Sequence, residues 1–167
     1  MTTLTNNTSS IASLSDKHCI FRCGDAVFSL PATTVREVTH APDIVPVPVS
    51  HDALAGIGHV HSEFLPVIAL APIVGEHAAV NGTSNQLLIL NSPLGDWGIL
   101  IDKVMAIHPV ETHVAAQHRN DSTATVLLGT ASFDGSVLSV LDVNSLQRVI
   151  QQTLHGRWTQ THPSTSH

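Results

Sequence analysis

Charged side chains are scarce in this chain of 167 residues. Lysine, arginine, aspartate and glutamate together make up 12% of it, about half the share found in an ordinary globular protein. The seven basic residues are scattered from Lys17 to Arg157 and the net charge is −6, so no basic patch is available to hold phosphates. We therefore expect no nucleic-acid partner, and the 43% of apolar residues predicts surface that a partner protein covers.

The chain also lacks a hydrophobic run long enough to cross a bilayer. The longest apolar run, residues 64–74, has 11 residues and is interrupted by Pro66 and Pro72. The first residues, MTTLTNNTSSIASLSDK, have neither the basic start nor the apolar segment of a secretory signal peptide. We expect a cytoplasmic protein that does not insert into the membrane.

Only two cysteines are present, Cys19 and Cys23, in the stretch HCIFRCGD. With His18 they could supply three ligands to a metal ion, but the residues between them are strand formers and a Gly-Asp turn follows. Cys19, Phe21 and Cys23 would then share one face of a strand. Because free cysteine packs as a small hydrophobe in a reducing compartment, we expect both side chains in the core.

Histidine is abundant, with 12 residues, and the stretch GIGHVHSEFLPVIAL brings two of them close together. His59 and His61 leave the same face of an extended chain, as two ligands of one metal would require. Zinc needs three or four converging ligands, and no C-x-x-C or H-x₃-H spacing accompanies this pair. We expect no bound metal and no cofactor; a histidine-rich metal-binding protein is the alternative.

Motifs of the common enzyme classes are missing as well. The sequence has no nucleophile elbow with serine, histidine and acid, and no P-loop. Gly56 and Gly58 begin a strand and do not open a helix, so they are not a dinucleotide-binding loop. We expect no enzymatic activity and assign no catalytic residue.

What the chain does contain is a series of short apolar or alternating runs, typical of a mainly β protein. They lie at residues 19–23, 26–30, 57–60, 64–70, 86–91, 97–101, 126–128 and 137–143. One helix is predicted over residues 144–156, with Asn144 as its N-cap and Gly156 as its end. The polar residues 1–15 and 157–167 predict flexible tails.

The strands also repeat. GIGHVHSEFLPVIAL from Gly56 aligns without gaps with GTASFDGSVLSVLDV from Gly129, at an offset of 73 residues. GDAVFSL from Gly24 aligns with GDWGILI from Gly95, at an offset of 71 residues. Two matches in the same order predict a duplicated unit of about 70 residues, the size of a small β-barrel. We expect one barrel over about residues 16–75 and another over about 86–143, joined near residues 75–86.

Four blocks of the sequence resemble the CheW-like domain in order and spacing. CGDAVFSLPATTVREV resembles that family's opening hairpin and the V-x-E-[IV] element after it, here Val35, Glu37 and Val38. GIGHVHSEFLPVIAL stands where the family has its N-L-R-G motif, WGILIDKVMAI where it has a V-D-x-V strand, and LLGTASFDGSVLSVLDVNSLQ where it has its last strands. The resemblance implies one domain over residues 16–156, all-β with a C-terminal helix, made of two five-stranded SH3-like β-barrels.

The resemblance also implies a function. CheW-like adaptors couple the cytoplasmic tips of methyl-accepting chemoreceptors to the regulatory domain of a CheA-type histidine kinase. On this chain the coupling surface would carry Val35, Glu37, Val38, His61 and Ser62. An adaptor of a type IV pilus twitching system is the alternative within the family.

One motif departs from the family pattern. The family's Asn-Leu-Arg-Gly is here His59, Val60, His61 and Ser62. In the family that arginine is thought to pair with the glutamate of V-x-E across the partner-binding face. Here Glu37 would face His61, and a histidine is mostly uncharged at pH 7. The chain therefore resembles a divergent member.

Overall fold

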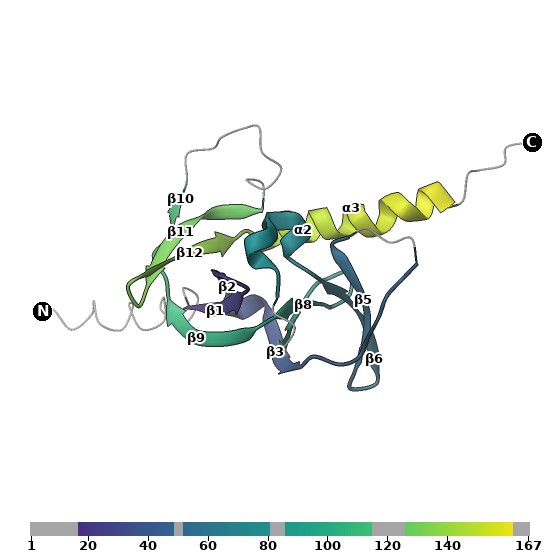
Figure 1. The fold of residues 1–167 in the computed structure, drawn as a ribbon, viewed down its shortest axis with the longest axis horizontal. Helices are drawn as coiled ribbons and strands as arrows, with labels where there is room; N and C mark the ends of the chain where they lie inside the picture. The colour runs from purple at the N-terminus through teal and green to yellow at the C-terminus, as the bar shows by residue number, and fades with distance from the viewer. Residues whose placement is uncertain (1–16, 49–51, 81–85, 115–125, 162–167) are drawn as a thin grey trace, which may run out of the picture.

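The computed structural model describes residues 17–48, 52–80, 86–114 and 126–161, with side chains in the last helix as far as Gln152. As predicted, the fold is mainly β with a C-terminal helix (Figure 1). In chain order the elements are β1 (Lys17–Cys23), β2 (Ala26–Pro31), η1 (Ala32–Thr34), β3 (Val35–His40), β4 (Ile44–Val45), β5 (Leu54–Val60), β6 (Glu63–Ile68), α2 (Ala71–Val74), η2 (Glu76–Ala78), β7 (Gln86–Leu90), β8 (Trp97–Ile101), β9 (Lys103–Pro109), β10 (His113–Val114), β11 (Leu127–Phe133), β12 (Ser136–Leu141) and α3 (Val143–Thr161).

The strands form two sheets. The first has the order β10-β11-β12-β2-β1-β9 and the second the order β3-β7-β8-β6-β5-β4. Each sheet has six strands where five were expected, because the two-residue strands β4 and β10 add to its edge. Within the described residues the outermost strands of a sheet do not pair with each other, so neither sheet closes into a barrel.

The duplication seen in the sequence is visible in the pairing. Gly56 on β5 follows a bulge and lies against the backbone of Val45 on β4. Gly129 on β11 also follows a bulge and lies against the backbone of His113 on β10. β6 then pairs in parallel with β8, as β12 does with β2. The two aligned blocks therefore occupy equivalent places in the two sheets.

Neither sheet is built from one copy, however. β1 and β2 join β9 to β12, and β7 and β8 join β3 to β6. The expectation that residues 16–75 and 86–143 each fold into their own barrel is therefore wrong, since the copies exchange their first hairpins. Only Asp102 lies between β8 and β9. A one-residue link is too short for a hairpin, so the chain passes into the other sheet.

The main core lies between the sheets. It contains Phe21 and Phe28 from the first sheet and Leu88 from the second. Leu146 of α3 packs in the same core. Cys19 and Cys23 belong to the same core, as do other buried residues of both sheets. The prediction that Cys19, Phe21 and Cys23 share one buried strand face is confirmed.

The thiols of this core are protonated over the whole neutral range. Burial raises the pKa of Cys19 to about 11 and that of Cys23 to about 12, and the charge of Asp102 adds to the second shift. We expect a thiol reagent at pH 8 to modify neither cysteine until the protein unfolds. The unfolded thiols ionise from about pH 9.0 while the buried ones stay protonated, so the free energy of unfolding keeps its full value below pH 9.0 and falls as the pH rises towards 11. Rapid labelling of the folded protein would contradict this prediction.

The C-terminal helix differs from its prediction at both ends. Asp142 is the capping residue in place of Asn144, because its carboxylate accepts hydrogen bonds from the backbone N–H and the hydroxyl of Ser145. α3 also continues past Gly156 to Thr161; a glycine inside a helix costs about 1 kcal/mol but does not have to end it. The predicted tail over residues 157–167 is therefore helical as far as Thr161.

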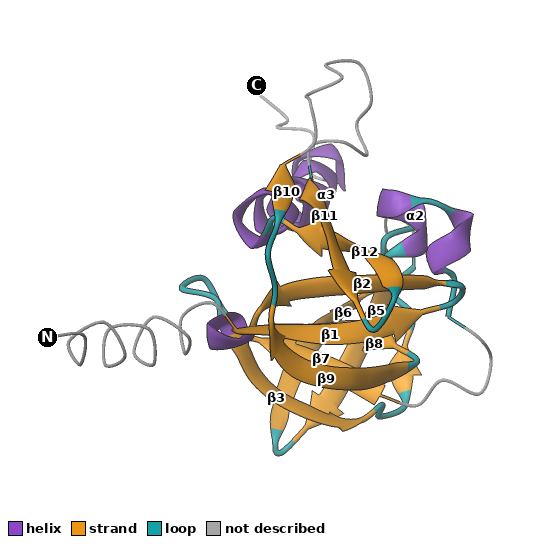
Figure 2. Cartoon of the chain, turned by 90° about the vertical axis from the view of Figure 1, so that its left-hand side faces the viewer, coloured by secondary structure: helices purple, strands orange, loops and turns teal. Residues whose placement is uncertain are grey.

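The predicted tail over residues 1–15 lies outside the described residues, as do residues 162–167. Among the helices that the structure describes, none is long and apolar enough to cross a membrane. Both views place α2 and α3 on one side of the two sheets and β3 on the side away from them (Figures 1 and 2). Strand β3 is thus an uncovered edge of the second sheet.

Candidate partner-binding site

Two segments far apart in the sequence meet at the edge of the second sheet. One is β3, which pairs with β7 on one side only. The other is the turn between β5 and β6, where His61 and Ser62 have φ angles of +48° and +72°. Val60 pairs with Glu63 across this turn, so the hairpin loop has only two residues. Positive φ at both loop residues is the geometry of a tight hairpin turn that follows the twist of the strands.

Glu37 and His61 are in contact, as the resemblance implied. The Nε2 atom of His61 lies 2.9 Å from Oε1 of Glu37. Oε1 is buried and has no hydrogen-bond donor among the described residues. The contact is electrostatic when His61 is protonated, and the side chain of Glu37 remains 31% exposed.

An arginine that the sequence analysis did not single out lies beside this pair. The Nη1 atom of Arg36 donates to Glu63 at 2.7 Å and to Asp96 at 2.9 Å. These two hydrogen bonds, first that to Glu63, raise the pKa of Arg36. Arg36 thus places a guanidinium from β3 beside the β5–β6 turn, where it holds Glu63. Its partners lie 27 and 60 residues away, so no local pattern could have revealed them.

The structure does not bring all five predicted residues onto one face. Val35 is half-buried and packs against the main core, so part of its role is structural. Glu37 meets His61, with Ser62 next to it in the exposed turn. Val38 follows Glu37 along β3 and its side chain leaves the opposite face of the strand. Val38 is 41% exposed.

His59 and His61, the two histidines of the stretch GIGHVHSEFLPVIAL, do not converge on a common ligand. The ring of His59 stacks on Phe64, with centroids 4.7 Å apart, while His61 turns towards Glu37. Among the described residues no group of three or more histidine, cysteine and acidic side chains is placed to hold a metal ion. The residues described at this site therefore contain no set of metal ligands.

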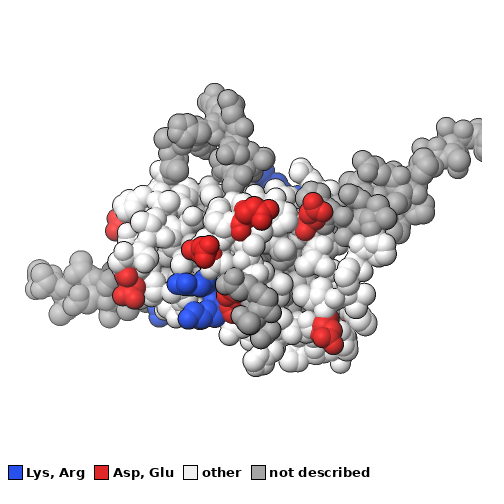
Figure 3. All heavy atoms as spheres, in the orientation of Figure 1, with Lys and Arg blue, Asp and Glu red and all other residues white. Residues whose placement is uncertain are grey.

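The molecular surface carries few charges. The face in Figure 3 is mostly free of Lys, Arg, Asp and Glu; the main group of basic side chains has acidic ones close by, whereas other acidic side chains stand alone. Five large apolar side chains are strongly exposed, namely Val45, Phe64, Leu94, Val114 and Val137. Such a surface suits recognition by apolar contacts more than by long-range electrostatic attraction.

Comparison with known proteins identifies the fold family. The family model described as the CheW-like domain matches residues 17–151. The chain belongs to this family. CheW-like relatives include "Chemotaxis protein CheW" of Treponema pallidum (strain Nichols), which is 26% identical over 133 residues, covering 75% of this chain and 78% of the relative.

A solved structure of a CheW protein has the same fold. It is the scaffolding protein TtCheW from Thermoanaerobacter tengcongensis, with a TM-score of 0.62 and 18% sequence identity. The match covers 77% of this chain and 89% of that one. The CheW-like arrangement of two sheets and a C-terminal helix is therefore confirmed.

The Asn-Leu-Arg-Gly motif of the CheW-like family suggests a test of backbone strain in the β5–β6 turn. Glycine is the family residue where this chain has Ser62, and a φ of +72° is strained for serine. We expect Ser62→Gly to raise the free energy of unfolding by about 1 kcal/mol, measured by urea denaturation. Ser62→Ala, which keeps the strain, is the control and should bring no such gain. A Ser62→Gly variant no more stable than wild type would show that the turn is unstrained.

Proposed function

We propose that this protein is a non-enzymatic chemotaxis adaptor that couples a chemoreceptor to a CheA-type histidine kinase in the cytoplasm. Its proposed partners are the regulatory domain of the kinase and the cytoplasmic tip of a methyl-accepting chemoreceptor. Membership of the CheW-like family over residues 17–151 carries the proposal. The names of its relatives, a chemotaxis protein and a scaffolding protein, support it.

The proposed contact surface consists of Glu37, Val38, His61 and Ser62, with Val35 supporting it from the core side. β3 lies at the edge of its sheet, so one row of its backbone N–H and C=O groups is open to a partner. The exposed side chain of Val38 can enter an apolar contact there. The side chain of Glu37 is 31% exposed, so its carboxylate can accept a hydrogen bond from the partner.

Calorimetric titration of the purified protein with the CheA-type regulatory domain of the same organism tests the proposal. We expect saturable binding with one site per chain, and the same for a receptor-tip fragment. A pull-down from native cells should recover kinase and receptor peptides together. If neither a chemotaxis nor a twitching kinase domain binds, the adaptor function is wrong.

A further inference from the structure

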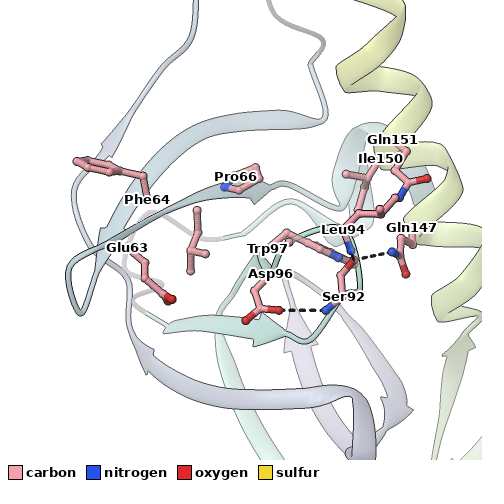
Figure 4. Close-up of a pocket in the computed structure, with 12 residues that line it drawn as sticks. Glu63, Phe64, Pro66, Ser92, Leu94, Asp96, Trp97, Gln147, Ile150 and Gln151 are labelled. Carbon is pink, nitrogen blue, oxygen red and sulfur yellow. Dashed lines mark hydrogen bonds between the residues drawn. The ribbon is translucent and has the colours of Figure 1, made fainter.

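A groove of about 530 Å³ lies between β6, the β7–β8 link and α3. Figure 4 shows Trp97 between the strand that carries Pro66 and the helix that carries Gln147, while the ring of Phe64 points away from that helix. Its apolar lining includes Pro66, Leu94, Trp97 and Ile150. The Nε1 atom of Trp97 is buried and has no hydrogen-bond partner among the described residues.

The equivalent place in the first copy is covered by the chain itself. There the β1–β2 turn stands where the β7–β8 link stands in the second copy, with Gly24 matching Gly95. The carbonyl of His77 accepts a hydrogen bond of 3.0 Å from the backbone N–H of Asp25. A Cβ atom on Gly24 would meet the carbonyl of His77 at 2.6 Å. Ala78, the residue after His77, is buried. Residues 75–79, with the small apolar side chain of Ala78 among them, therefore cover the β1–β2 turn.

Among the described residues the second copy has no such cover, because its helix continues without a break. In the first copy α2 ends at Gly75, whose φ of +117° turns the chain back over the sheet. At the offset of 73 residues Arg148 takes the place of Gly75, and α3 runs straight on. A Cβ atom on Gly95 would meet nothing within 4 Å in the described structure. The groove beside α3 is the space that the folded-back segment fills in the first copy.

The charge at the rim of the groove is negative. Glu63 and Asp96 both line it, and both bind the single guanidinium of Arg36. Two carboxylates against one cation leave an excess of one negative charge. The other polar side chains of the rim, Ser92, Gln147 and Gln151, are uncharged donors and acceptors that suit a peptide backbone.

We propose that this groove binds a short segment of a partner protein, apolar at its centre and flanked by a basic residue. The segment takes the place that residues 75–79 occupy on the first copy. Its small apolar side chain packs on Leu94 and Trp97, its backbone bonds to the rim glutamines, and its basic residue lies near Glu63 and Asp96. This site lies on the helix side of the molecule, and its rim meets the proposed β3 contact at Glu63 and Asp96, which bind Arg36.

The chain's own covering segment provides the probe. We would titrate ¹⁵N-labelled full-length protein with a capped peptide of residues 75–80 in which lysine replaces Glu76. The indole N–H of Trp97 reports on the groove, and Trp158→Phe removes the other indole signal. We expect saturable shifts of this signal and of the side-chain amides of Gln147 and Gln151. The peptide with glutamate retained should bind about two- to fivefold more weakly.

A matched pair of variants decides whether the peptide sits in the groove. Leu94 is 76% exposed and Val137, on the first sheet, is 72% exposed, so both can be replaced without unfolding the protein. We expect Leu94→Ser to remove the peptide-induced shifts and Val137→Ser to leave them unchanged. Val38→Asp should also leave them unchanged, which separates this site from the adaptor face.

Three results would overturn the proposal. The first is the absence of saturable shifts up to about 5 mM peptide, near the weakest affinity that such a segment can have. The second is a change of the Trp97 signal when residues 162–167 are deleted without peptide, because the chain's own end would then fill the groove. The third is a shift that grows with protein concentration alone, which would make a second copy the occupant.

Discussion

Val38→Asp is expected to abolish binding of the kinase regulatory domain while leaving the protein folded. Val38 is 41% exposed on an edge strand, so the charge remains solvated in the free protein. In the complex the carboxylate would be buried against an apolar surface without a partner. The expected loss is about 3 kcal/mol or more, over about a hundredfold in Kd, measured by calorimetric titration.

Two controls sharpen this result. Ile107 on β9, the outermost strand of the first sheet, is 53% exposed, and Ile107→Asp should leave the affinity close to that of wild type. His61→Arg restores the family arginine opposite Glu37 and should keep or improve binding, by no more than about 1 kcal/mol for an exposed pair. Unchanged affinity in folded Val38→Asp protein would show that β3 is the wrong face.

Gly56→Ala and Gly129→Ala are each expected to lower the free energy of unfolding by about 3 kcal/mol. At both positions an added methyl group would collide with the backbone of the neighbouring edge strand, at Val45 on β4 and at His113 on β10. Backbone atoms cannot rotate away as a side chain can, so β4 or β10 must separate from its sheet. Urea denaturation measures the loss.

Gly135→Ala is the matched control for this pair. Gly135 lies in the β11–β12 turn with a φ of +76°, and nothing described lies within 4 Å of an added methyl group. Gly135→Ala should therefore lower the free energy of unfolding only by the backbone strain, about 1 kcal/mol. If Gly56→Ala and Gly129→Ala lose no more than Gly135→Ala, the two bulged strands do not approach their neighbours as closely as described.

The sequence predicted the repeat but not the way in which its copies combine. The match between Gly56 and Gly129 identifies equivalent strands, because both sites require the same close approach of two backbones. Self-similarity cannot show which hairpin pairs with which sheet, since both hairpins carry the same apolar pattern. The exchange depends on the one-residue link at Asp102, whose shortness is apparent only once the ends of β8 and β9 are known.

The candidate site was predictable only where a motif marked it. The family resemblance led to Glu37 and His61, and the structure brings these two side chains together. Arg36 precedes that glutamate and has no motif of its own; its role follows from where the hairpin and the β7–β8 link place Glu63 and Asp96. The groove beside α3 was missed because it depends on how the helix lies against β6 and the β7–β8 link, and the helical pattern does not show which elements the helix packs beside.

The most direct test of the adaptor function is co-sedimentation of the kinase with receptor-containing membranes. Membranes carrying the cognate chemoreceptor would be mixed with the CheA-type kinase, with and without this protein, and then pelleted. We expect much more kinase in the pellet when the protein is present, and a return to background with Val38→Asp. The same amount of sedimented kinase with and without the protein would contradict coupling.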